Sequence, residues 1–219
     1  MKSRIRWAIV FVAGLTLVAQ LGVAAASAAG NTAISSVTVT SGNAQYSSQV
    51  VVNFATPLTA SQAQTVTQTI DSQLGAVAVA GSGATSSSIL APAPSSTYYY
   101  PISCSSGDNL FTDSDGTFGV RNNCPYNVFN WHFRLSSYWQ SVAISLVTET
   151  GMGWLRNGNS MPTGARHVDP ADYLFHGTLN PVYVGDKIFY TDHFDFTVDI
   201  GGNVGSASML INGYLQATA

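Results

Sequence analysis

Charged side chains are scarce in this chain, and after residue 29 the positively charged ones are the scarcest. Lys, Arg, Asp and Glu together make up 9% of the 219 residues. Beyond Ala29 the chain has five Lys and Arg against eleven Asp and Glu, a formal net charge of −6. No cluster of basic residues occurs there. Because such a chain repels phosphate groups, nucleic acid and anionic membrane surfaces are excluded as partners.

A long apolar run occurs once, in residues 7–18, directly after three basic residues. It is short for a membrane span, and the small residues Ser, Ala and Ala follow it at 27–29. These three features are typical of a secretory signal. The sequence therefore predicts a cleavable signal peptide over residues 1–29, a secreted mature chain that starts at Gly30, and no association with the membrane after cleavage.

Cysteine occurs only at Cys104 and Cys124. A metal site needs three or four ligands close together, and the sequence has neither a Cys-x-x-Cys motif nor a Cys/His cluster. In an oxidising compartment two cysteines are expected to pair, and closing a loop of about twenty residues contributes on the order of 3 kcal/mol. The sequence predicts a Cys104–Cys124 disulfide, with no metal and no other cofactor.

Composition divides the mature chain into parts. Residues 30–80 consist mainly of Ser, Thr, Ala, Val and Gln, and Asp71 is their only charged residue. Residues 81–97 are rich in Gly, Ser and Pro and are expected to form a linker. Aromatic and charged residues then appear together in residues 98–219. We expect this last part to fold alone, and residues 30–80 to dock on it or on a partner.

One short helix is predicted in the N-terminal segment. Thr59 and Gln62 have the spacing of a capping box, and Gly75 is well placed to end the helix. The apolar stripe between them has helical spacing and consists of Ala63, Val66, Ile70 and Leu74. Strands are predicted on either side of this helix, at residues 37–40, 49–54 and 76–80.

Alternating apolar and polar side chains predict strands in residues 98–219. The alternation is clean in residues 129–136, where four apolar side chains share one face: Phe129, Trp131, Phe133 and Leu135. Looser strand patterns occur at 141–148, 172–179, 187–200 and 205–216. Turns are predicted at residues 113–116, 157–158 and 201–203. So many short strands and turns favour an antiparallel two-sheet β-sandwich.

The turn at residues 113–116 also resembles half of a calcium loop, because Asp113 and Asp115 precede Gly116. A complete loop would need an oxygen ligand at position 111 and an acid at position 122, where Phe111 and Asn122 stand. The residues therefore predict an ordinary hairpin turn.

Histidines are the first candidates for a functional site, since they can bind a metal or move protons. The chain has four: His132, His167, His176 and His193. His193 and Asp195 share the polar face of the strand predicted at 187–200, about 7 Å apart. His167 and Asp169 lie in a predicted loop that could approach them. Either a shared binding site or a solvated strand face explains these residues.

Aromatic side chains near predicted turns are the second candidates. Tyr138, Trp139 and Trp154 could form exposed platforms for a sugar ring or a protein partner. Packing in the core is the alternative for each of them.

Catalytic signatures are missing from the sequence. It contains no Gly-x-Ser-x-Gly motif, and Glu149 is the only glutamate. Residues 149–158 (ETGMGWLRNG) and 172–178 (DYLFHGT) resemble small secreted proteins of unknown activity from filamentous actinobacteria. The resemblance covers about the last 120 residues, and it implies export and a β-rich domain.

Together these features predict a secreted, non-catalytic interaction or adaptor protein that binds an extracellular protein. Components of exported antibacterial assemblies belong to this class. The alternative is a carbohydrate-binding or carbohydrate-cleaving module, in which exposed Trp and Tyr act with Asp192, Asp195 or His193. A polysaccharide is then the partner.

Overall fold

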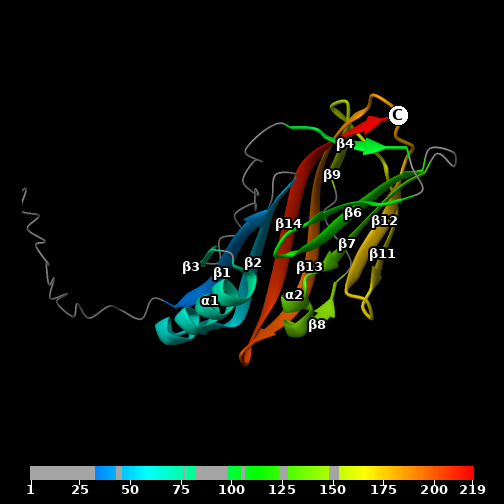
Figure 1. Ribbon diagram of the computed structural model, residues 1–219. Coiled ribbons are helices and arrows are strands. Elements are labelled where there is room, and N and C mark those ends of the chain that lie inside the picture. The colour runs from blue at the N-terminus through cyan, green and yellow to red at the C-terminus, as the bar shows by residue number, and fades with distance from the viewer. Residues whose placement is uncertain are drawn as a thin grey trace, which may run out of the picture. The chain divides into compact units, whose positions relative to one another are not determined.

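The computed structural model describes residues 33–42, 46–75, 77–81, 98–104, 107–123, 128–147 and 153–219. The strands within these ranges form two sheets, and the predicted antiparallel two-sheet β-sandwich is confirmed (Figure 1). None of the helices in these ranges is long and apolar enough to cross a membrane. The predicted signal peptide (1–29) and almost all of the predicted linker (81–97) lie outside the described residues.

The larger sheet has nine strands, and its two longest strands lie at the centre. In order across the sheet it contains β10 (Asn159–Ser160), β9 (Gly153–Arg156), β13 (Lys187–Ile200), β14 (Asn203–Thr218), β2 (Tyr46–Leu58), β1 (Ile34–Gly42) and β3 (Val77–Gly81). Two further strands pair with the central ones: β8 (Ala143–Leu146) with β13, and β4 (Tyr100–Ser103) with β14. The β4–β14 pair is parallel and the other pairs are antiparallel.

The smaller sheet has five strands and packs against the larger one. Its order is β11 (Thr163–Asp169), β12 (Leu174–Leu179), β7 (Val128–Leu135), β6 (Gly116–Asn123) and β5 (Asn109–Thr112). Aromatic rings fill the space between the sheets. The ring of Phe194 on β13 lies 4.8 Å from that of Phe133 on β7 and 4.9 Å from that of Phe175 on β12, centroid to centroid. The predicted alternation on β7 is confirmed, since its four apolar residues are buried.

Two helices accompany the sheets: α1 (Ala60–Leu74) lies beside β1, β2 and β3, and α2 (Ser137–Val142) lies next to β8 (Figure 1). The predicted ends of α1 are confirmed. Thr59 and Gln62 form the capping box, and Gly75 ends the helix in the left-handed conformation with a φ of 61°. Ala63, Val66 and Ile70 are buried in the core, whereas Leu74 is half-buried.

The predicted separation between an N-terminal segment and a β-domain differs from the structure. β2 pairs with β14 in continuous register from Tyr46 opposite Gly213 to Phe54 opposite Gly205. Residues 31–219 thus form a single compact unit, and the valines of β1 and β2 belong to the same core as the aromatic rings. Residues 34–58 supply strands of the sandwich itself, and this pairing argues against residues 98–219 folding alone.

Cys104 directly follows β4. It forms a parallel bridge with Asn122, two residues before Cys124, and it is not a free thiol. Cys124 lies outside the described residues, so the Cys104–Cys124 bond stays a prediction.

A buried carboxylate joins the two sheets at the turn between β5 and β6. Asp115 is fully buried and accepts hydrogen bonds from three side chains. The donors are Ser41 Oγ, Ser48 Oγ at 2.7 Å and Trp139 Nε1 at 2.9 Å. They come from β1, β2 and α2, so this Asp115 cluster connects the larger sheet with the smaller one. The predicted hairpin turn at 113–116 is confirmed, and its second carboxylate has a structural role that the sequence did not reveal.

Asp113, two residues earlier, stabilises the turn through hydrogen bonds, but its surroundings disfavour the ionised form of its carboxyl group. Its Oδ1 accepts hydrogen bonds from the backbone N–H groups of Asp115 at 2.9 Å and Gly116 at 3.1 Å. Burial, followed by the negative charge of Asp115, raises the pKa of Asp113 to about 6 from an ordinary value of 3.8. The folded state therefore binds a proton more readily than the unfolded state, and this contribution to stability is lost as the pH rises through 6.

Asp113→Asn should stabilise the protein at neutral pH. The amide keeps the Oδ1 acceptor of the turn and removes the charge that is unfavourable beside Asp115. We expect the free energy of unfolding to rise by about 1–3 kcal/mol at a pH near 7.5. The difference should shrink below pH 6 and vanish below about pH 4, where the wild-type carboxyl is protonated in both states. Urea unfolding at several pH values measures this, and a difference that does not depend on pH would contradict it.

Candidate functional site

The three aromatic residues predicted as binding platforms lie inside the protein. Trp139 and Trp154 are 0% and 1% exposed, and Tyr138 is 8% exposed. Trp139 donates to Asp115, Trp154 stacks on Tyr190 at 5.4 Å between ring centroids, and burial raises the pKa of Tyr138 to about 12. The prediction of exposed platforms is wrong for these residues: Tyr138 and Trp139 lie in α2 and Trp154 lies in β9, and their side chains are buried in the core.

His193 and Asp195 lie together on the outer face of β13, as their spacing predicts. His193 Nε2 is 3.2 Å from Asp195 Oδ1, and Ser208 on β14 contacts His193 and donates to Asp195 at 2.6 Å. In a Ser-His-Asp triad the serine and the carboxylate contact opposite nitrogens of the ring. Here they share Nε2, so the three side chains form a hydrogen-bonded surface cluster without the geometry of an activated nucleophile.

His167 and Asp169 do not lie near this cluster, contrary to the prediction. His167 and Asp169 belong to strand β11 of the smaller sheet, and His167 stacks on His176 instead. Among the described residues, no three His, Cys, Asp or Glu side chains are grouped so that they could hold a metal ion.

A groove of about 620 Å³ runs over the outer face of the smaller sheet. Strand alternation creates it, since Trp131 and Phe133 point into the core and the residues between and beside them point outward. We call it the histidine groove, and its defining residues are Asp108, Arg121, His132, Arg134, His167 and His176. The other lining residues include Leu110, which is 59% exposed.

The three histidines of the groove form one row across three strands. His167 on β11 pairs in register with His176 on β12, and His176 pairs with His132 on β7. The rings of His167 and His176 stack with their centroids 5.3 Å apart. Gly119 on β6 continues the row, and a Cβ at that position would lie only 2.2 Å from the His132 ring. A glycine is therefore required where this imidazole lies over the neighbouring strand.

Two arginines lie beside the three histidines of the groove. Arg134 is exposed, and Arg121 forms an ion pair with Asp108 at 3.8 Å, between Nε and Oδ1. Asp108 is the acid that lines the groove, and Asp169 lies on the same face of β11 as His167. Burial lowers the pKa of His132, Asp108 opposes this effect, and the nearby Arg134 lowers the pKa further. Protonation of the imidazoles adds positive charge to a surface that already carries it.

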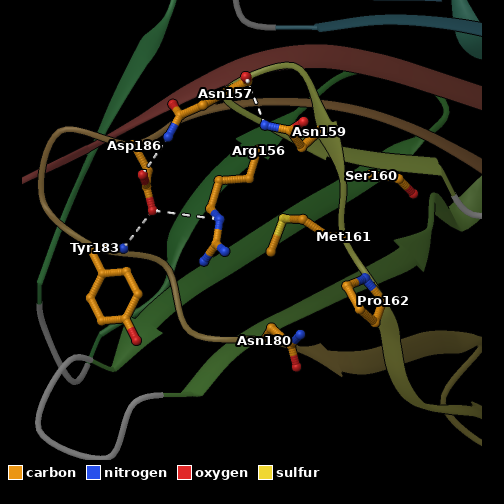
Figure 2. A pocket seen from close by; sticks show the side chains of 9 residues that line it. All are labelled: Arg156, Asn157, Asn159, Ser160, Met161, Pro162, Asn180, Tyr183 and Asp186. Atoms are coloured by element: carbon orange, nitrogen blue, oxygen red, sulfur yellow. Dashed lines mark hydrogen bonds and ion pairs between the residues drawn. The ribbon is translucent and has the colours of Figure 1, made fainter.

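A second pocket of about 330 Å³ lies beside the hairpin of β9 and β10 (Figure 2). The predicted turn at 157–158 is confirmed, since Asn157 and Gly158 have φ values of 51° and 82°. Asp186 accepts hydrogen bonds from Asn157 Nδ2 at 2.7 Å and from the backbone of Tyr183 at 2.9 Å. Arg156 donates to the carbonyl of Pro181 at 2.7 Å. These bonds attach the loop before β13 to the hairpin.

Three further polar side chains line the hairpin pocket. Figure 2 shows the side chains of Asn159, Ser160 and Asn180 around the space, with the ring of Tyr183 at one side. Tyr183 is 57% exposed, and the guanidinium of Arg156 lies 5.9 Å from its ring centroid. An exposed aromatic ring beside amide and hydroxyl groups is suited to a small polar ligand.

The histidine groove could be found only in part from the sequence. His132 stands on the polar side of the clean alternation at 129–136, and His176 lies in the run at 172–179. Nothing in the sequence fixes the register in which these strands pair, and it is the register that aligns the rings.

Comparisons with known proteins add no functional assignment. No family model matches the chain, and no curated protein or solved structure matches it either. The function must therefore be argued from the geometry of the surfaces described above.

Proposed function

We propose that this chain is an exported, non-catalytic binding protein that engages an acidic extracellular protein through the histidine groove. The observation that carries the proposal is the concentration of positive charge in one groove of an acidic chain. Arg121 and Arg134 are two of the five Lys and Arg beyond residue 29, and both line it. Complementary charge of this kind selects a partner and speeds association.

The groove also has the rigidity that a docking surface needs. Its residues stand on paired strands, and the inner faces of these strands are anchored by Phe133, Phe175 and Trp131 in the core. Preformed side chains lose little entropy on binding, which favours affinity. This assignment replaces the docking role expected of residues 30–80, because β1 and β2 are built into the larger sheet.

Arg134→Gln should weaken capture of the partner. The mature chain on beads, incubated with culture supernatant of the producing organism, should retain a protein with an acidic surface, and retention should fall roughly tenfold in the variant. Lys187→Gln is the matched control, since it removes one positive charge outside the groove. A partner retained equally by both variants, or one with a basic surface, would contradict the proposal.

Mass spectrometry of the secreted protein tests export, with Gly30 as the expected N-terminus.

A second candidate function is carbohydrate binding, which the hairpin pocket favours. Its exposed Tyr183 ring can stack on a sugar, and the amides of Asn159 and Asn180 can bond hydroxyl groups. Retention on an insoluble polysaccharide that is lost on Tyr183→Ala and kept on Tyr98→Ala, another exposed tyrosine, would support it. Equal retention of both variants would exclude the pocket.

A further inference from the structure

The histidine row places three imidazole side chains inside a groove that already holds two arginines. An unperturbed imidazole has a pKa of about 6.5, so its charge changes between about pH 8 and pH 5. Because the rings of His167 and His176 stack and His176 pairs with His132, positive charges on these rings would repel one another. A bound anion would relieve this repulsion.

We propose that the histidine row makes the groove a pH-dependent binding site for carboxylate groups, which binds acidic protein segments more tightly as the pH falls from about 8 to about 6. This inference rests on the proposed function, because it specifies which chemistry the groove recognises and when. Glutamate and aspartate side chains remain ionised over this range, so the change in affinity originates in the protein.

The charged groups that face the row from each strand support this direction. Arg121 on β6 and Arg134 on β7 are positive throughout the range, and Asp108 before β5 is partly neutralised by Arg121. Asp169 on β11 is the second acid on this face by strand alternation, two residues from His167. With all three histidines protonated, five positive groups would face these two acids.

Proton binding and carboxylate binding at the histidine row are coupled through these charged groups. Arg134 and His176 disfavour the charged form of His132, and its burial does so more strongly. A carboxylate bound beside the row would favour the charged form, so binding takes up protons. Ligand affinity must then increase with proton concentration over the range in which the row titrates.

The test uses a peptide of about ten glutamates as the probe and the mature chain as the protein. Its dissociation constant, measured by calorimetry at constant ionic strength, should be roughly tenfold lower at pH 6 than at pH 8. His176→Gln removes the middle ring and should flatten this dependence. His193→Gln is the matched control, because it removes a histidine of the larger sheet and should leave the dependence unchanged.

A second measurement keeps the inference testable if one variant folds poorly. In nuclear magnetic resonance spectra the peptide should shift the ring resonances of His132, His167 and His176 more at pH 6 than at pH 8, and it should leave those of His193 unchanged. His167→Gln, at an exposed position, then replaces His176→Gln. Equal affinity at both pH values, or an equal pH dependence in His176→Gln and His193→Gln, would overturn the inference.

The outcomes also separate this inference from the proposed function. If the peptide binds with the expected pH dependence but no acidic protein is captured from the supernatant, the carboxylate site stands and the assigned partner does not. If an acidic protein is captured equally at pH 6 and pH 8, the proposed function stands and the pH-dependent site is overturned. If inorganic phosphate binds in this way and the peptide does not, the carboxylate assignment is overturned.

Discussion

A chain that starts at Tyr98 should lack a cooperative unfolding transition. It would lose β1, β2, β3 and α1, and β14 would lose the partner that pairs with it from Gly205 to Gly213. Buried valines of β1 and β2, including Val37, Val39 and Val50, would leave the core, and each buried side chain of this size contributes about 1.5–3 kcal/mol. Because whole domains are stable by only about 5–15 kcal/mol, we expect aggregation or a transition without cooperativity.

In the matched control every strand is retained, but the backbone is cleaved at one position. A protease site inserted among residues 82–97 lies between β3 and β4, so cleavage should leave the two fragments associated through β2 and β14. Circular dichroism and gel filtration of the cleaved and truncated proteins provide the comparison. A truncated protein that unfolds cooperatively would show that residues 98–219 form an independent domain.

Asp115→Ala should destabilise the protein strongly. Its side chain accepts hydrogen bonds from Ser41, Ser48 and Trp139. The buried donors Ser48 and Trp139 would lose this acceptor, whereas Ser41 would keep its contact with Asp113. Each unsatisfied buried group costs about 1–3 kcal/mol, while relief of the repulsion with Asp113 offsets part of the loss. We expect the free energy of unfolding at pH 7 to fall by about 2–4 kcal/mol.

A substitution of the neighbouring Asp113 serves as the comparison for Asp115→Ala. Asp113→Asn is expected to stabilise the protein at the same pH, so two acids separated by one residue should give effects of opposite sign. Ser48→Ala removes a single donor and should cost less than Asp115→Ala. If the substitutions at 113 and 115 change stability equally and in the same direction, the Asp115 cluster does not hold the sheets together.

Local signals in the sequence predicted much of the fold. The capping box at Thr59, the left-handed glycine at Gly75 and the turn at 201–203 depend on neighbours within a few residues, and the structure has all three. The period-two pattern likewise predicted β13, from Lys187 to Ile200, with its buried face. Such features depend on backbone conformation and on which side of a strand is apolar.

These local signals did not predict which strands pair when they are far apart in the sequence. The weak strand pattern at 49–54 gave no indication that β2 joins β14, and a boundary drawn from composition separated strands that share a sheet. The same limit applies to the candidate sites. Trp139 in α2 and Trp154 in β9 were predicted near turns but are buried, and the three histidines align only through the pairing of β11, β12 and β7. Register and burial arise from the whole sheet, which no short segment encodes.

The place of β14 in the chain sets the order in which this fold can be completed. β14 joins β13 to β2, yet it is the last of the described strands to be synthesised, and its residues pair with strand β2 about 150 residues earlier. Contacts so far apart in sequence make folding slow, because a long loop must close before they form. The larger sheet cannot close before β14 has been synthesised. A sheet that closes only after its late central strand has been made suits the proposed export through a channel that accepts unfolded chains.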